Sequence, residues 1–85
     1  MSYRVELSRT AVRELRRVPT PYHDAIVRAL RGLEKDPRPT GCKKLVGGSG
    51  FWRIRVGSYR VVYEIADRIR LVSIERIADR KDAYR

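Results

Sequence analysis

The stretch FWRIRVGSYRVVYEI, residues 51–65, decides the fold of this chain. Gly57 and Ser58 divide it into two runs in which apolar and polar side chains alternate, and such alternation is the period of a β-strand. A Gly-Ser connection between the runs predicts a tight hairpin turn. Folding the runs about this turn places the apolar side chains on one face, in the pairs Val56–Tyr59, Ile54–Val61 and Trp52–Tyr63.

The opposite face of the predicted hairpin is basic. Arg55 lies opposite Arg60, and Arg53 lies opposite Val62. A register moved by one residue would bury the arginines, so the pattern favours this register. Like charges opposed across two strands cost up to ~1 kcal/mol, and salt screens part of that cost at an exposed site. Two interpretations follow: a solvated basic face, or an anion site where phosphate bridges the guanidinium groups.

The rest of the chain predicts two helices and further strands around this hairpin. Ser8 and Thr20 are the expected N-caps of the helices, and Pro19 ends the first helix. A short connection makes the two helices an antiparallel hairpin. The order predicts one α+β domain, residues 1–85, with the helices on one face of the sheet and the other face open. The expected elements are a strand at 3–7, helices at 8–18 and 21–36, a loop at 37–50 with a short strand at 44–46, and strands at 51–57, 59–66 and 69–77.

The turn between the last two strands is expected at Asp67-Arg68. In that register Glu75 lies opposite Arg60 on the open face and neutralises one of the three arginines. The remaining expected pairs are Val61–Ile74, Tyr63–Val72 and Val62–Ser73.

The composition is strongly basic. Lys and Arg total 20 against 10 acidic residues, the net charge is +10, and only four of the basic residues are lysines. The planar donor fork of arginine suits phosphate. An excess of this size favours a polyanionic partner, nucleic acid before membrane; the alternative is a basic surface that keeps the protein soluble.

Cysteine and histidine are too few for a disulfide or a zinc site. Cys42 is the one cysteine and His23 the one histidine, so no metal or other cofactor is expected. A lone cysteine and the lack of a signal-peptide pattern or long apolar stretch predict a cytoplasmic protein without membrane association.

Several motifs together resemble the RelE/ParE superfamily of toxins from type II toxin–antitoxin systems. The most specific is RIRVGSYRVVYEI (53–65), which is similar to the family's R-x-G-x-Y-R-x-x-Y signature. The DPRP sequence after the second helix (36–39), KLVG (44–47) and IADRKDAYR (77–85) extend the resemblance over nearly the whole chain. It implies a RelE-like fold.

The resemblance also implies a function. The RelE branch cleaves messenger RNA in the ribosomal A site, by attack of a 2′-hydroxyl on the adjacent phosphate and without a metal, and thereby inhibits translation. The ParE branch instead poisons DNA gyrase, and a third alternative is a decayed toxin that keeps only antitoxin binding. For RNA cleavage the implied catalytic residues are Arg53, Arg55, Arg60, Arg80 and Tyr84. The implied RNA-binding residues are Arg53, Arg55, Arg60, Arg76 and Lys81.

The implied partners are the ribosome, messenger RNA and a cognate antitoxin. An acidic segment of the antitoxin is expected to cover the basic face, and the helical hairpin is a second expected docking surface. DNA would be contacted only indirectly, through the toxin–antitoxin complex.

Two departures from the family pattern leave the general base open. Arg53 and Arg55 stand where RelE-like relatives often have lysines, and arginine does not act readily as a base because its pKa is above ~12. Asp79 stands where relatives often have a histidine. The carboxylates of Asp79 and Glu75 are the candidates for proton transfer.

Overall fold

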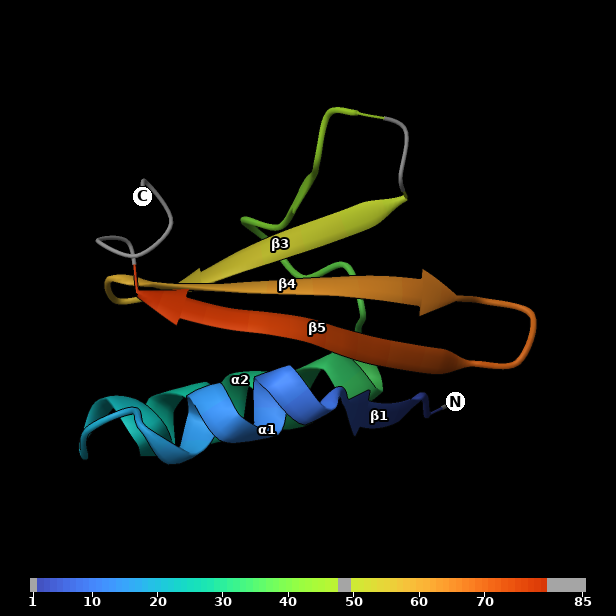
Figure 1. Cartoon of the computed structure of the whole chain (residues 1–85). Helices are drawn as coiled ribbons and strands as arrows, with labels where there is room; N and C mark the ends of the chain where they lie inside the picture. Colours follow the sequence, from blue (N-terminus) through green and yellow to red (C-terminus); the bar gives the residue numbers. More distant parts are fainter. Residues whose placement is uncertain (1, 48–49, 80–85) are drawn as a thin grey trace.

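Five strands form one sheet with two helices packed on one of its faces, as seen in the computed structural model (Figure 1). The structure describes residues 2–47 and 50–79, so the predicted site residues Arg80, Lys81 and Tyr84 lie outside the described residues. The strand order is β1-β5-β4-β3-β2, in which β1 runs parallel to β5 and the other pairs are antiparallel. This confirms the predicted α+β fold. The elements are β1 (Arg4–Leu7), α1 (Arg9–Arg16), α2 (Tyr22–Lys35), β2 (Lys43–Lys44), β3 (Phe51–Val56), β4 (Tyr59–Ala66) and β5 (Leu71–Asp79).

The two helices begin in different ways. Ser8 caps α1 as predicted, because its Oγ accepts a hydrogen bond of 3.0 Å from the Ala11 amide. The prediction that Thr20 caps the second helix is wrong. Pro21 is the cap residue of α2 and supplies no side-chain hydrogen bond; its carbonyl accepts from the Ala25 amide instead.

The core lies between the helices and the sheet. Helices α1 and α2 contribute apolar residues at helical spacing to the core, and the strands contribute every second residue. Partly buried Trp52, Val56 and Tyr59 pack around it, so the apolar face predicted for the hairpin is confirmed. The buried residues are Ala11, Val18, Ile26, Leu30, Leu33, Ile54, Val61, Tyr63, Val72, Ile74 and Ile77.

The register of the β3–β4 hairpin matches the prediction at every pair. Gly57 has a φ of +60° at the first turn position, where type II′ hairpin turns take glycine. Ile54 pairs with Val61, and Arg55 pairs with Arg60. The tight turn therefore fixes which side chains of both strands share a face.

The predicted register of the β4–β5 hairpin is wrong. The turn spans four residues, 67–70, instead of two, because Arg70 adopts a φ of +52° and its amide donates to the Asp67 carbonyl. A register shift between Val62 and Tyr63 then leaves Glu75 without a partner in β4. The observed pairs are Tyr59–Asp79, Arg60–Ala78, Val61–Ile77, Val62–Arg76, Tyr63–Ile74, Glu64–Ser73, Ile65–Val72 and Ala66–Leu71.

This β-bulge has a clear physical reason. Without the extra residue, strict alternation after Ile74 would turn Arg76 toward the core and Ile77 outward. The bulge at Glu75 reverses the alternation, so Ile77 is buried and Arg76 is exposed. Glu75 therefore does not face Arg60, and the expected neutralisation of that arginine does not occur.

A polar clasp fastens the loop after α2 to the β4–β5 turn. Arg38 donates hydrogen bonds of 3.1 and 2.8 Å to the two carboxylate oxygens of Asp67, and the Tyr3 hydroxyl donates one of 2.7 Å. The Arg38 guanidinium also lies 5.1 Å from the centre of the Trp52 ring. These hydrogen bonds, above all those from Arg38, lower the pKa of Asp67 to about 2.

The clasp predicts acid sensitivity. An aspartate in the unfolded chain has a pKa of about 3.9, so Asp67 stabilises the fold fully above that pH and the contribution is lost as the pH falls toward about 2. We expect the difference in melting temperature between the parent and Asp67→Asn to shrink over this window. Glu64→Gln, at an exposed position of β4, is the control. A difference that stays constant down to pH ~2 would contradict this assignment.

Candidate functional site

Basic side chains form two cross-strand rows on the open face of the sheet. Residues paired in register share a face, so the pairing of β2, β3, β4 and β5 defines these rows. The first row contains Lys43, Arg53, Val62 and Arg76. The second row contains Arg55, Arg60 and Ala78. The sheet thus brings Arg53, Arg55 and Arg60 together on the face that the helices leave uncovered, as the sequence predicts.

Four of these cations carry no counter-charge in the part of the chain that the structure describes. No ion pair or side-chain hydrogen bond is formed there by Lys43, Arg53, Arg55 or Arg60. Their Cα atoms are held by the backbone ladder of β2, β3 and β4, so all four side chains start from neighbouring positions on one face. Such a cluster attracts a polyanion and can place several donors around one phosphate group. We call Lys43, Arg53, Arg55 and Arg60 the cationic face.

Lys43 is a member of the cationic face that the sequence reasoning missed. The short strand was expected at 44–46 but comprises Lys43–Lys44, and Lys43 pairs with Arg53. A strand of two residues has no alternation to detect. Lys44 lies on the other face, with its Nζ 6.0 Å from the centre of the Trp52 ring.

Arg76 differs from the other predicted RNA-binding arginines because Glu14 of α1 binds it. Its Nε and Nη2 donate to Glu14 Oε2 at 3.0 and 2.8 Å, and the other carboxylate oxygen of Glu14 accepts the Ile77 amide at 2.7 Å. The hydrogen bonds to Glu14 raise the pKa of Arg76. Arg76 therefore has a counter-charge, unlike the residues of the cationic face. Through the Ile77 amide, Glu14 also holds the end of β5, which precedes Arg80 in the sequence.

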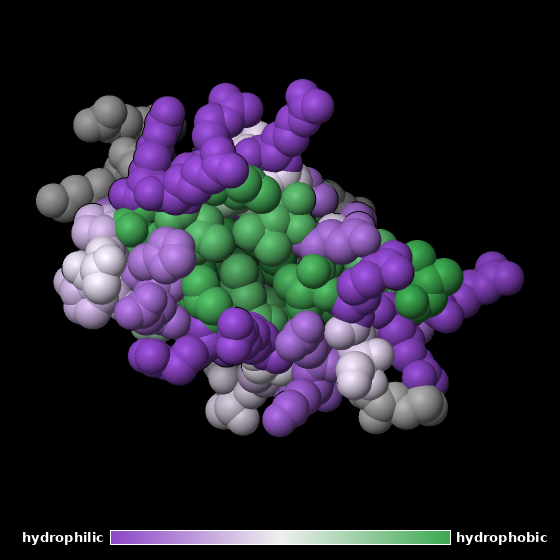
Figure 2. Space-filling model, turned by 90° about the horizontal axis from the view of Figure 1, so that it is seen from below, coloured by the Kyte–Doolittle hydropathy of each residue, from purple (hydrophilic) through white to green (hydrophobic). Residues whose placement is uncertain are grey.

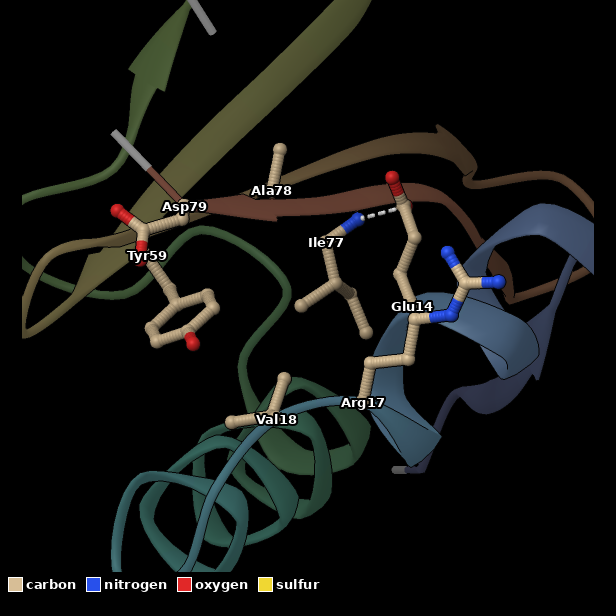
Figure 3. A pocket seen from close by; sticks show the side chains of 7 residues that line it. All are labelled: Glu14, Arg17, Val18, Tyr59, Ile77, Ala78 and Asp79. Carbon is tan, nitrogen blue, oxygen red and sulfur yellow. Dashed lines mark hydrogen bonds between the residues drawn. The ribbon is translucent and has the colours of Figure 1, made fainter. Parts of the chain in front are cut away.

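A cavity of about 200 Å³ lies beside this strand end, on the helical side of the sheet (Figure 3). Asp79 pairs in register with Tyr59, whose ring faces the helices, so the Asp79 carboxylate lies at the cavity and not among the arginines. Of the two carboxylate candidates for proton transfer, Asp79 is therefore on the helical side and Glu75 is in the bulge. The lining residues are Glu14, Arg17, Val18, Tyr59, Ile77, Ala78 and Asp79.

Two further features are absent from residues 2–47 and 50–79. No group of His, Cys, Asp or Glu side chains there has an arrangement that could hold a metal ion. None of the helices in those ranges has the length and apolar character needed to cross a membrane.

Comparison with known proteins places the chain in a family. The model for the ParE toxin of type II toxin–antitoxin systems, parDE, matches residues 5–84. The chain belongs to the RelE/ParE superfamily of toxins. Toxin RelG of Mycobacterium tuberculosis is 34% identical over 100% of this chain and 99% of its own length, and toxin RelE of the same organism is 37% identical over 98% and 87%.

A solved toxin–antitoxin complex contains a chain with the same fold. The RelBE2 toxin–antitoxin complex of Mycobacterium tuberculosis contains a chain that matches with a TM-score of 0.83 and 30% identity, over 93% of this chain and 99% of that one. The present protein is therefore a RelE/ParE toxin of a toxin–antitoxin system. The cationic face lies on strands β2, β3 and β4 of this toxin fold.

Proposed function

We propose that this RelE/ParE toxin is an endoribonuclease that cleaves messenger RNA on the ribosome and so arrests translation. The observation that supports this most is the cationic face: its four cations lie on rigid strands and have no counter-charge among residues 2–47 and 50–79. A stable fold does not need opposed arginines at Arg55 and Arg60, whereas a phosphate ligand supplies the missing negative charge. The activity belongs in the cytoplasm, where its target is.

The proposed reaction is an internal phosphodiester transfer. The 2′-hydroxyl of one nucleotide gives up its proton and its oxygen bonds to the adjacent phosphorus. The bond from phosphorus to the 5′-oxygen breaks, and that oxygen takes up a proton. The products are a 2′,3′-cyclic phosphate and a 5′-hydroxyl. Arg53, Arg55 and Arg60 would stabilise the additional charge on the phosphorane oxygens. Arg80 and Tyr84 are the further proposed catalytic residues, with Lys81 and Arg76 contributing to RNA binding.

Lys43 extends this proposal beyond the sequence-based set. Its pairing with Arg53 places it at the outer end of the first basic row. A lysine there acts as a point charge on the RNA backbone, so it would add binding without orienting the reacting phosphate. Its contribution should depend on salt more than the contribution of Arg60 does.

Mapping RNA 5′ ends after induction tests the proposal. We expect cuts within translated messages, in phase with the codons, and 5′-hydroxyl ends. Arg60→Ala is the matched variant, which we expect to be inactive. Intact messages during growth arrest would overturn the proposed nuclease.

The second candidate function is gyrase poisoning, and the matched family model favours it because that model describes ParE toxins. In this case, the cationic face would contact gyrase or the bound DNA without any RNA chemistry. Trapped gyrase–DNA cleavage complexes with intact messages would establish this candidate in place of the nuclease.

We also propose that the cognate antitoxin covers the cationic face with an acidic segment. Solved relatives include a toxin bound to an antitoxin, as in the RelBE2 complex. Carboxylates would neutralise the same arginines that phosphate would bind, so antitoxin and RNA would compete for one surface.

A further inference from the structure

One aromatic residue lies on the open face of the sheet, next to the cationic face. Phe51 begins β3, and its side chain points away from that of Trp52, so it shares a face with Arg53 and Arg55. The opposite, helical side of the molecule has apolar surface at its centre (Figure 2). Among residues 2–47 and 50–79, Phe51 is only partly buried and is not one of the side chains packed against the core. Its ring therefore keeps accessible surface beside the arginines.

Pairing across the sheet brings a carboxylate and a hydroxyl next to this ring. Phe51 pairs in register with Glu64 of β4, and Glu64 pairs with Ser73 of β5. The Cβ atoms of directly paired residues lie about 4.5–5.5 Å apart, so the three side chains start from adjacent points on one face. We call Phe51, Glu64 and Ser73 the aromatic row. It runs parallel to the first basic row, one step along the strands.

The carboxylate of Glu64 has no counter-charge in the part of the chain that the structure describes. It forms no ion pair or side-chain hydrogen bond there. Glu6, which pairs with Ser73 from the other side, is instead bound by Arg4 at 3.1 Å. The negative charge of Glu64 repels RNA phosphate and an acidic antitoxin segment alike, but a carboxylate accepts hydrogen bonds from the amino groups of a nucleic-acid base.

The spacing along β3 is compatible with single-stranded RNA. Alternate residues of a strand are about 6.7 Å apart, so Phe51, Arg53 and Arg55 follow one another at equal steps on the open face. Proteins that bind single-stranded RNA combine cations along the backbone with aromatic rings on which bases stack. A phosphate held by the arginines would therefore bring the base of a neighbouring nucleotide within reach of the Phe51 ring.

We propose that the aromatic row is a base-binding subsite, at which Phe51 stacks on one base of the messenger RNA and Glu64 accepts hydrogen bonds from it. The inference rests on the proposed RNA cleavage and adds base selection to it. Adenine, guanine and cytosine present an amino group on their Watson–Crick edge. Uracil instead presents two carbonyl oxygens there, which the Glu64 carboxylate repels because it accepts hydrogen bonds and does not donate them. The subsite should therefore disfavour uracil.

Replacing the ring while keeping its bulk tests the role of Phe51. Phe51→Leu retains an apolar side chain of comparable size, so most packing is kept, but the face on which a base stacks is lost. We expect this variant to cleave ribosome-bound message about 5- to 100-fold more slowly than the parent. Phe51→Tyr keeps the ring and should cleave at close to the parent rate. The matched control is Ile69→Ala, because Ile69 is 66% exposed in the β4–β5 turn.

Base preference tests the role of Glu64. The probe is a set of otherwise identical messages in which each base in turn occupies each position of the codon in the ribosomal A site. We expect the parent to cleave at least about fivefold more slowly when uracil occupies one of the three positions. Glu64→Gln should reduce this penalty at the same position, because an amide can also donate to a carbonyl oxygen. Glu34→Gln, at an exposed position of α2, should keep the parent profile.

Four results would overturn the subsite while leaving the proposed nuclease intact. Parent-like cleavage by Phe51→Leu would make Phe51 a packing residue, and equally slow cleavage by Phe51→Tyr would show that the ring is not what matters. A uracil penalty that is absent, or unchanged in Glu64→Gln, would remove Glu64 from the base. Normal cleavage with weaker antitoxin binding by Phe51→Leu would make the antitoxin the occupant. A parent that cuts no ribosome-bound message would instead overturn the proposed function, and the subsite with it.

Discussion

Replacing Arg60 by Ala should abolish growth arrest while the protein stays folded. Arg60 stands opposite Arg55 at the centre of the cationic face, so we expect it to contact the reacting phosphate. Loss of one donor to transition-state charge costs about 100- to 1,000-fold in rate. Removing one of two opposed guanidinium groups also relieves repulsion of up to ~1 kcal/mol. The melting temperature should therefore hold or rise slightly while cleavage of ribosome-bound message falls.

Arg68→Ala is the matched control for this prediction. Arg68 lies exposed in the β4–β5 turn, and its replacement removes the same charge from a place outside the cationic face. We expect it to leave cleavage within about twofold of the parent, because one distant surface charge is largely screened. Antitoxin binding should persist in Arg60→Ala, because the proposed antitoxin contact also involves Lys43, Arg53 and Arg55. If Arg60→Ala cleaves as fast as the parent, the arginine cluster is not the reaction site.

The fold was predicted best where the turn geometry and the burial pattern of a segment require the same strand register. The alternation in FWRIRVGSYRVVYEI has one register that buries Ile54, Val61 and Tyr63 together, and Gly57 gives the tight turn that this register requires. The placement of Arg53, Arg55 and Arg60 on one face was predicted from the same alternation, because the residues between the apolar ones must face the other way.

The β4–β5 hairpin was mispredicted because its turn and bulge depend on tertiary packing. Asp67 takes part in a clasp with Arg38 and Tyr3, which are distant in sequence, and this clasp fastens the longer turn. A trace of the bulge is nevertheless visible in the sequence: the apolar residues Val72, Ile74 and Ile77 change from a spacing of two to a spacing of three.

Ion pairing and edge strands were the parts of the site that local patterns did not reveal. The pairing of Arg76 with Glu14 joins β5 to a helix 62 positions earlier in sequence, and periodicity within either element does not encode it. The same limit applies to Lys43, whose place opposite Arg53 depends on how the loop after α2 returns to the sheet.

Glu14→Ala should destabilise the fold and loosen the strand end that leads to Arg80. Pairing of β1 with β5 stops at Leu7–Ile74, and α1 then continues along that edge with side chains in place of a strand. Ser8 Oγ donates to the Glu75 carbonyl at 2.9 Å, and Glu14 accepts the Ile77 amide at 2.7 Å. A hydrogen bond to a charged group contributes about 1.5–3 kcal/mol, whereas the Arg76 ion pair, with Arg76 56% exposed, adds little.

We therefore expect Glu14→Ala to lose about 2–3 kcal/mol in the free energy of unfolding by urea titration, and the Ile77 amide to exchange faster with solvent. Glu14→Gln should retain part of this stability, because its amide oxygen can still accept from Ile77. Glu34→Ala, an exposed glutamate on α2, is the matched control. Slower cleavage by Glu14→Ala at a temperature where it remains folded, restored in part by Glu14→Gln, would assign Glu14 the positioning of the C-terminal arginine. Equal cleavage by all three variants would limit its role to stability, because the strand end would then not need Glu14 to present Arg80 to the RNA.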